Sequence, residues 1–118
     1  MATIKSYTDI SQSKRLAKIL PIESADMCIN STNPYMIFTE VRPIEGFDDE
    51  HDPCWSLAAL LGVIQKNTPY TMQHFGDKKV QLVCDLGDKP WELIISDFNN
   101  EVDACYEMIL KLHELNLL

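Results

Sequence analysis

The sequence predicts an α+β fold in which about three helices pack on a small, mainly antiparallel sheet built from two hairpins. Two pairs of short, strand-like segments each flank a cluster of turn-forming residues, and three segments with helical spacing of apolar residues alternate with them. The expected order is helix, hairpin, helix, hairpin, helix. No repeat or linker divides the 118 residues, so we expect a single domain over residues 1–118 with one hydrophobic core.

The first helix is expected over residues 10–20, where apolar side chains recur at helical spacing. Thr8 or Asp9 can cap its N-terminus, because a short side-chain oxygen accepts a hydrogen bond from an unpaired backbone N–H. Pro21 ends the helix, since proline disfavours helical geometry in the residue before it.

A hairpin and a second helix are expected next. Residues 26–29 and 35–41 are strand-like, and the turn-forming residues between them predict that the two segments pair. The second helix is predicted to have Asp52 as its cap and Pro53 as its first residue, a position where proline loses no hydrogen bond. Residues 55–64 are apolar nearly all round, so we expect this helix to be central and buried.

The second hairpin is expected to pair residues 80–84 with residues 91–95 across a turn that contains glycine, aspartate and proline. Residues 70–75 are a candidate for one further short strand. The last helix is predicted over residues 101–115 with Asn100 as its cap.

This last helix carries an apolar stripe that extends to the end of the sequence. The stripe consists of Val102, Cys105, Tyr106, Ile109 and Leu112, widened by Met108, Leu115 and Leu118. An apolar end either docks on its own body or meets a partner chain. A homodimer through the C-terminal helix is therefore an open alternative to a monomer.

Acidic residues outnumber basic ones by 18 to 10, which gives a formal net charge of -8. A protein that binds bare nucleic acid normally has the opposite sign, so no direct binding to nucleic acid is expected. The acidic residues are densest over residues 45–52, a segment without Lys or Arg. They are Glu45, Asp48, Asp49, Glu50 and Asp52. These side chains are a candidate docking surface for a basic partner.

The sequence also predicts a compartment. The first residues contain no apolar run of signal-peptide length, and no stretch approaches the roughly 20 apolar residues that span a bilayer. The four cysteines are widely spaced and form no CxxC motif, which favours reduced and mostly buried thiols. We therefore expect a cytoplasmic protein without membrane contact.

Cys54 is the strongest candidate for a nucleophile, because the first turn of a helix lowers the pKa of a thiol. His51 lies three residues before it, and a Cys–His pair supports nucleophilic catalysis. The surrounding carboxylates oppose thiolate formation, so an unreactive, packed thiol is the favoured interpretation and no enzyme activity is expected. No second pair with zinc-ligand spacing and no phosphate-binding glycine loop is present, so we expect neither metal nor cofactor.

A different class of function is the binding of a small molecule. Lys14, Arg15 and Lys18 make the first 20 residues locally basic, and cationic side chains contact phosphate groups. Trp55 and Trp91 are candidates for stacking on a ligand ring. These residues are the candidate binding set of an alternative hypothesis, in which the protein sequesters a small molecule.

Three segments of the chain together resemble a family of short uncharacterised proteins from gut Bacteroidales and their phages. They are residues 11–27 (SQSKRLAKILPIESADM), 53–61 (PCWSLAALL) and 102–115 (VDACYEMILKLHEL). The resemblance implies a phage or mobile-element gene expressed in a bacterial cytoplasm. No activity is known for the family, so the resemblance assigns no catalytic residue.

Taken together, these features predict a non-enzymatic accessory protein that engages a host protein. The alternative hypothesis is a protein that sequesters a nucleotide-like signal and so antagonises host defence. An enzyme with Cys54 as its nucleophile is the third hypothesis.

Overall fold

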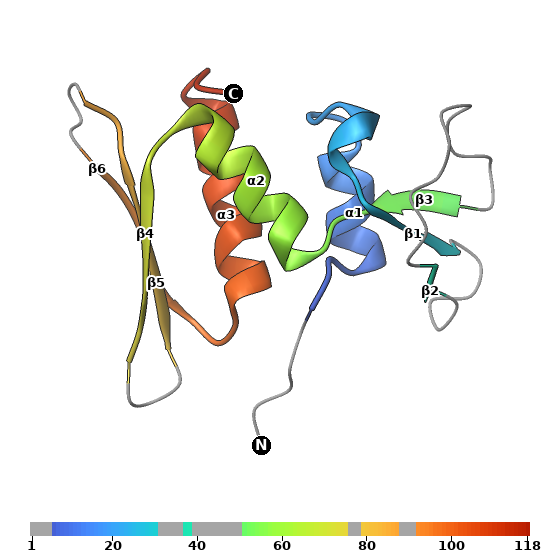
Figure 1. Ribbon diagram of the computed structural model, residues 1–118, viewed down its shortest axis with the longest axis horizontal. Helices are drawn as coiled ribbons and strands as arrows, with labels where there is room; N and C mark the ends of the chain where they lie inside the picture. The colour runs from blue at the N-terminus through green and yellow to red at the C-terminus, as the bar shows by residue number, and fades with distance from the viewer. Residues whose placement is uncertain (1–5, 31–36, 39–50, 76–78, 88–91) are drawn as a thin grey trace. The chain divides into compact units, whose positions relative to one another are not determined.

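A computed structural model describes residues 6–30, 37–38, 51–75, 79–87 and 92–118 of the chain (Figure 1). Among these residues, one compact unit spans Ser6–Ala59 and a second spans Leu60–Leu118. Both units combine helices with a small antiparallel sheet, so the predicted α+β class is confirmed. The two predicted hairpins lie in separate three-stranded sheets, one in each unit. A single domain stays a prediction.

The described part of the first unit combines a short helix with a small sheet. Its elements are α1 (Ile10–Leu16), a 3₁₀ turn η1 (Ile22–Ser24), β1 (Met27–Asn30), β2 (Ile37–Phe38) and β3 (His51–Cys54). The strand order is β2-β1-β3, and β1 is antiparallel to both neighbours. The predicted pairing of the first hairpin is therefore confirmed, with Cys28 opposite Phe38.

Helix α1 begins as predicted and ends earlier. Asp9 caps it in a reciprocal capping box, in which Asp9 Oδ1 accepts from the Gln12 N–H at 2.8 Å and Gln12 Oε1 accepts from the Asp9 N–H at 3.2 Å. The helix ends at Leu16 rather than at residue 20. The reason is that the N–H groups of Lys18 and Ile19 bond to carbonyls three residues back, which tightens the chain into a turn.

The predicted start of the second helix at Asp52 and Pro53 is wrong. Both residues lie in β3, where Pro53 is opposite Cys28 of β1. Strand β3 is at the edge of the sheet, and an edge strand accepts proline because one side of its backbone needs no partner. The helix α2 (Leu57–Asn67) begins instead after Ser56, whose Oγ accepts a hydrogen bond from the Ala59 N–H at 3.2 Å.

Helix α2 is also less buried than predicted. Of its residues, Leu60 and Ile64 are buried, Leu61 and Val63 are partly buried, and the exposed residues are Ala58, Gly62 and the polar residues 65–67. The helix is therefore amphipathic, with one narrow stripe toward the core rather than an apolar surface all round.

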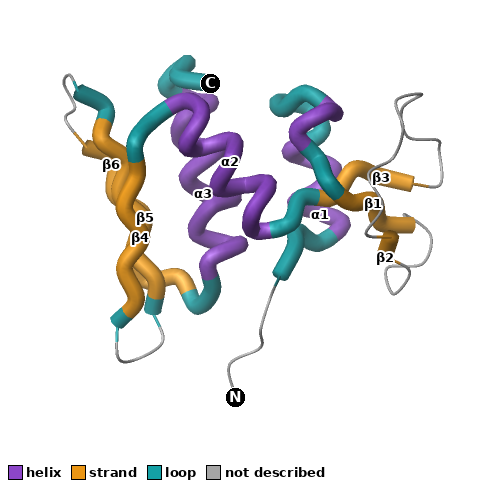
Figure 2. The backbone as a smooth tube through the Cα atoms, in the orientation of Figure 1, coloured by secondary structure: helices purple, strands orange, loops and turns teal. Residues whose placement is uncertain are grey.

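The second unit contains a three-stranded sheet with helices on one face (Figure 2). The strands are β4 (Tyr70–His74), β5 (Val80–Asp85) and β6 (Glu92–Phe98), in that order across the sheet, and α3 (Glu101–Glu114) follows them. Both α3 and the residues of α2 that belong to this unit lie on the same side of the sheet. The second hairpin and the further strand at residues 70–75 are thus confirmed.

Helix α3 follows its prediction closely. Asn100 caps it by accepting a hydrogen bond from the Asp103 N–H at 2.8 Å. Its buried side chains are Val102, Ala104, Cys105, Tyr106, Met108, Ile109 and Leu112. Leu115 and Leu118 were expected to widen this stripe, but both are exposed because the helix ends at Glu114 and the chain turns after it.

Candidate functional site

The most distinctive surface of the second unit is the face of its sheet opposite α3 and the α2 residues of that unit, which we call the open face. Alternation along β5 separates the two faces, because Val80, Leu82 and Cys84 are buried whereas the residues between them are not. Helix α3 packs against β5 and β6 on the buried side. The open face therefore carries the alternate residues of β5 and their cross-strand partners.

One row of the open face is apolar. Thr71 of β4 pairs with Val83 of β5, which in turn pairs with Ile94 of β6. The Ile94 side chain is 50% exposed, the same fraction as Phe75, and no other described large apolar residue is more exposed. An exposed isoleucine in a strand centre loses the stabilisation that burial would give, so this row is suited to contact with a partner.

The next row on the same face is acidic. Asp85 at the end of β5 pairs directly with Glu92 at the start of β6. Gly87, which has a positive φ of 72°, donates its N–H to Asp85 Oδ1 at 2.9 Å and holds that carboxylate in place. Like charges directly opposite each other on one face of a sheet destabilise the pair. Within the described parts of the chain, neither carboxylate forms an ion pair.

The two rows meet in a hollow of about 340 Å³. Its lining residues are Pro69, Tyr70, Thr71, Val83, Asp85 and Glu92. The lining thus combines apolar and hydroxyl-bearing side chains with two carboxylates. A group that combines a positive charge with an apolar body, such as the side chain of lysine or arginine, fits this lining.

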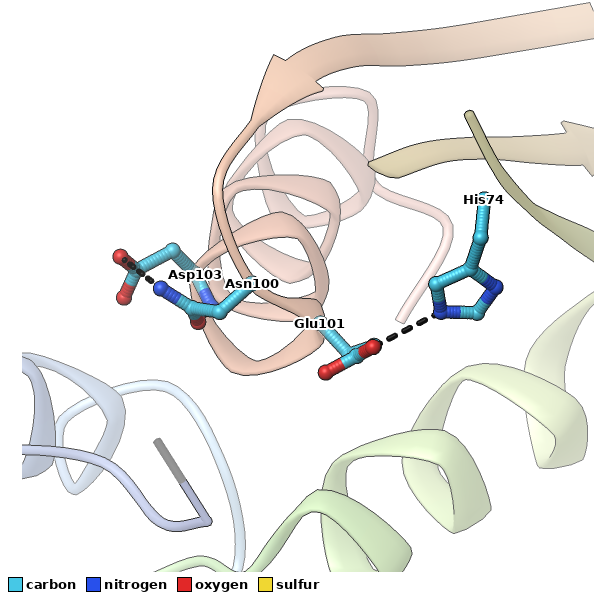
Figure 3. Close-up of polar contacts among 4 residues, drawn as sticks. All are labelled: His74, Asn100, Glu101 and Asp103. Carbon is cyan, nitrogen blue, oxygen red and sulfur yellow. Dashed lines mark hydrogen bonds and ion pairs between the residues drawn. The ribbon is translucent and has the colours of Figure 1, made fainter. Parts of the chain in front are cut away.

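A second polar arrangement lies where β4 ends and α3 begins (Figure 3). His74 Nε2 is 2.7 Å from Glu101 Oε1, and the Asn100 side chain donates to Asp103 Oδ2 at 2.8 Å. The pKa of Glu101 is lowered, first by a hydrogen bond from its own backbone N–H and then by the hydrogen bond and charge of His74. His74 pairs with Val80, whose side chain is on the helix-covered side, so this pair is not part of the open face.

Cys54 lies in a buried network rather than in the first turn of a helix. Its Sγ donates to the Thr8 carbonyl at 3.3 Å, and Thr8 Oγ1 donates to Sγ at 3.6 Å. Burial raises the pKa of the Cys54 thiol. A protonated and fully buried thiol is a poor nucleophile, so the position does not suit the catalytic hypothesis. The side chain of His51 is outside the described part of the structure.

Of the residues proposed for small-molecule binding, those that the structure describes do not form one site. Lys14 and Arg15 lie exposed in the last turn of α1, and Lys18 is exposed in the turn after it. Trp55 is fully buried, and its Nε1 donates to Ser24 Oγ at 2.9 Å, so it has no free ring face for stacking. Trp91 lies outside the described residues.

The acidic segment of the sequence falls largely outside the described residues as well. Glu45, Asp48, Asp49 and Glu50 are among the residues that the structure does not describe, and only the backbone of Asp52, in β3, is described. A docking role for this segment stays a prediction.

The pair formed by Asp85 and Glu92 was missed in the sequence, although a signal for it is present. The predicted turn lies midway between these two residues, and a hairpin centred on that turn places residue 85 opposite residue 92. Alternation of buried residues along residues 80–84 then puts both carboxylates on the solvent side.

Among the described residues, no group of three or more His, Cys, Asp and Glu side chains is arranged to hold a metal ion. In the same part of the chain, no helix has the length and apolar character needed to cross a membrane. The sequence matches no protein-family model, and searches of curated proteins and of solved structures also find no match.

Proposed function

We propose that this chain is a non-enzymatic binding protein that holds a cationic segment of another protein on its open face. The observation that carries the proposal is the pairing of Asp85 with Glu92 on a sheet face whose apolar row is uncovered. The occupant would place a lysine or arginine between the two carboxylates and an apolar side chain against Val83 and Ile94.

Charge supports this choice of partner. A cation between Asp85 and Glu92 would replace a repulsive contact with two attractive ones, so binding would relieve a cost present in the free protein. The net charge of -8 would also speed the encounter with a basic partner. A second copy of the chain is a poor occupant, because it would bring the same carboxylates toward each other.

The resemblance to proteins of Bacteroidales and their phages supports a host protein in a bacterial cytoplasm as this partner. Many host proteins that handle nucleic acid have basic surfaces, and an acidic protein competes for such surfaces by electrostatic complementarity. Under this proposal, the acidic residues 45–52 would add to the negative charge that attracts a basic partner.

The test uses a capped hexapeptide with alternating Lys and Val as the probe, titrated into the isotopically labelled protein at low salt and followed by NMR. Shifts are expected for the amides of β4, β5 and β6 that surround Asp85 and Glu92. The double variant Asp85→Asn with Glu92→Gln should weaken binding about tenfold, which corresponds to roughly 0.7 kcal/mol for each partly exposed ion pair.

The matched control is Glu23→Gln with Glu107→Gln, which makes the same change in net charge at η1 and α3. The control should retain nearly all of the affinity. An equal loss in both double variants would mean that the peptide responds only to net charge, and the proposed site would be wrong.

A further inference from the structure

A second hollow adjoins the acidic one. It has a volume of about 280 Å³ and is lined by Asn67, Thr68, Pro69, Asp85, Leu86, Gly87 and Leu117. Pro69 and Asp85 line both hollows, so the two are neighbours across these residues. Both carboxylates line the first hollow, whereas Asp85 and, from the residues after α3, Leu117 line the second.

Leu117 reaches this position through a specific helix ending. Asn116 has a positive φ of 58° and donates its N–H to the His113 carbonyl at 3.0 Å, and Leu117 donates to the Leu112 carbonyl at 2.9 Å. These two bonds are those of a Schellman motif, which reverses the chain at a helix C-terminus. Leu117 is therefore held in place by backbone bonds although its side chain is 40% exposed.

The second hollow offers mainly apolar contacts. The Asp85 N–H and the Thr68 hydroxyl both donate to the Pro69 carbonyl, at 3.0 and 3.3 Å, so these polar groups are already bonded within the chain. Leu86, Leu117 and the Pro69 ring remain as the surfaces that a ligand can cover. Apart from the Asp85 carboxylate that it shares with the first hollow, this hollow offers surfaces that stabilise an apolar side chain.

We propose that the two hollows form one docking surface for an extended protein segment in which an apolar residue stands close to a basic one. The basic side chain occupies the hollow of Asp85 and Glu92, and the apolar side chain contacts Leu117, Leu86 and Pro69. This inference rests on the proposed function and adds the partner's sequence pattern to it. Asp85 borders both hollows, so its carboxylate fixes where the cation sits relative to the apolar residue.

The test measures the affinity of fluorescent peptides built on a Gly–Ser background by anisotropy. Each peptide contains one Lys and, one to four residues after it, either Leu or Ser. At the best spacing, Leu should bind about fivefold tighter than Ser, as expected for a leucine that loses part of its exposure. In the variant Leu117→Ser, the Leu and Ser peptides should bind with about equal affinity.

The control is Leu118→Ser, because Leu118 has nearly the same exposure as Leu117, 38% against 40%, and does not line the hollow. It should keep the full preference for Leu. The inference would be overturned if the wild-type protein showed no preference for Leu over Ser, or if Leu117→Ser kept that preference. In either case, binding that still depends on the peptide Lys and on Asp85 and Glu92 would leave the proposed function intact. If neither peptide binds in an Asp85-dependent way, the proposed function and the inference are both wrong.

Discussion

The Glu101 carboxylate in the first turn of α3 lies 2.7 Å from Nε2 of His74 at the end of β4. The contact joins two elements that are 27 residues apart in sequence. The pKa of Glu101 is lowered, first by a hydrogen bond from its own backbone N–H and then by the hydrogen bond and charge of His74. The stability of the second unit should therefore depend on the ionisation of this residue.

The expected pH dependence follows from the sign of that shift. A lowered pKa in the folded state means that ionised Glu101 stabilises the fold above about pH 4.5, and that this contribution disappears as the pH falls through the folded-state pKa. Glu101→Gln should cost about 0.5 kcal/mol of unfolding free energy at pH 7 and less than that at pH 3. Urea unfolding at both pH values measures the difference. Glu107→Gln, in the middle of α3, is the control, and an equal loss there would contradict the assignment.

The helix ending at Asn116 predicts an unusual order of stabilities. A side chain with a Cβ is strained in the left-handed region, and only glycine and, to a lesser degree, asparagine adopt it readily. Asn116→Ala should lower the free energy of unfolding by roughly 1 kcal/mol, whereas Asn116→Gly should leave it unchanged or raise it slightly. Denaturant unfolding of the two variants decides the matter, and equal stabilities would exclude the Schellman motif.

Thr8 is predicted to be a stability determinant of the first unit. Its fully buried Oγ1 lies 2.8 Å from Ser13 Oγ and accepts the Trp55 N–H at 3.1 Å. Thr8→Val keeps the shape and leaves the Trp55 N–H buried without a partner, which should cost about 1–3 kcal/mol. Thr8→Ser retains the hydroxyl and should recover most of that loss in the same unfolding experiment. A valine variant as stable as the wild type would show that water satisfies the Trp55 N–H.

The thiols should be inert in the native protein. All four cysteines are buried, and burial raises the pKa of Cys54, Cys84 and Cys105, the last to about 12. Iodoacetamide at pH 8 should therefore add no mass to the native protein over minutes and four carbamidomethyl groups after unfolding in urea. Intact-mass spectrometry reads both results, and rapid labelling of Cys54 in the native state would revive the nucleophile hypothesis.

Removing the repulsion between Asp85 and Glu92 should stabilise the fold and weaken the binding of a cationic peptide. Glu92→Lys would place opposite charges across the strands, with Asp85 still fixed by the Gly87 N–H. The free energy of unfolding should rise by roughly 0.5 kcal/mol, and the affinity for the Lys–Val hexapeptide should fall more than for Glu92→Gln. Thermal unfolding measures the change in stability, and the NMR titration measures the change in peptide affinity. A destabilised Glu92→Lys variant would mean that the carboxylates do not repel each other.

Local signals in the sequence predicted the elements whose stability is local. The cap at Asn100 and the buried stripe of α3 depend on residues within a few turns, and the hairpin of β5 and β6 depends on its own turn. The predicted helix start at Asp52 and Pro53 rested on the same kind of local signal and was wrong. Pairing of these residues with Met27–Asn30 of β1 overrides the local preference.

The candidate site was less accessible to sequence reasoning for a similar reason. Its two carboxylates follow from the register of one hairpin, but the apolar hollow beside them needs a chain reversal after α3 that returns Leu117 toward Pro69 and Leu86. Asparagine at position 116 is compatible with such a reversal, but it does not by itself predict the position of the Leu117 side chain. The acidic residues are densest over residues 45–52, and this density favoured that segment as the docking surface over the pair of Asp85 and Glu92.

The attachment of residues 6–8 beside residues 55–57 has a consequence for biosynthesis. Thr8 donates its N–H to the Trp55 carbonyl and Leu57 donates to the Ser6 carbonyl, both at 3.0 Å, and Tyr7 forms a bridge with Ser56. The earliest of these residues leaves the ribosome long before its partner is made, so residues 6–8 stay unpaired during that time, although the capping box of α1 is local. Closure of the first unit is then a late event set by the emergence of Leu57, and such distant contacts slow folding. Pausing of translation just after this point would give the unit time to close before the second sheet is synthesised.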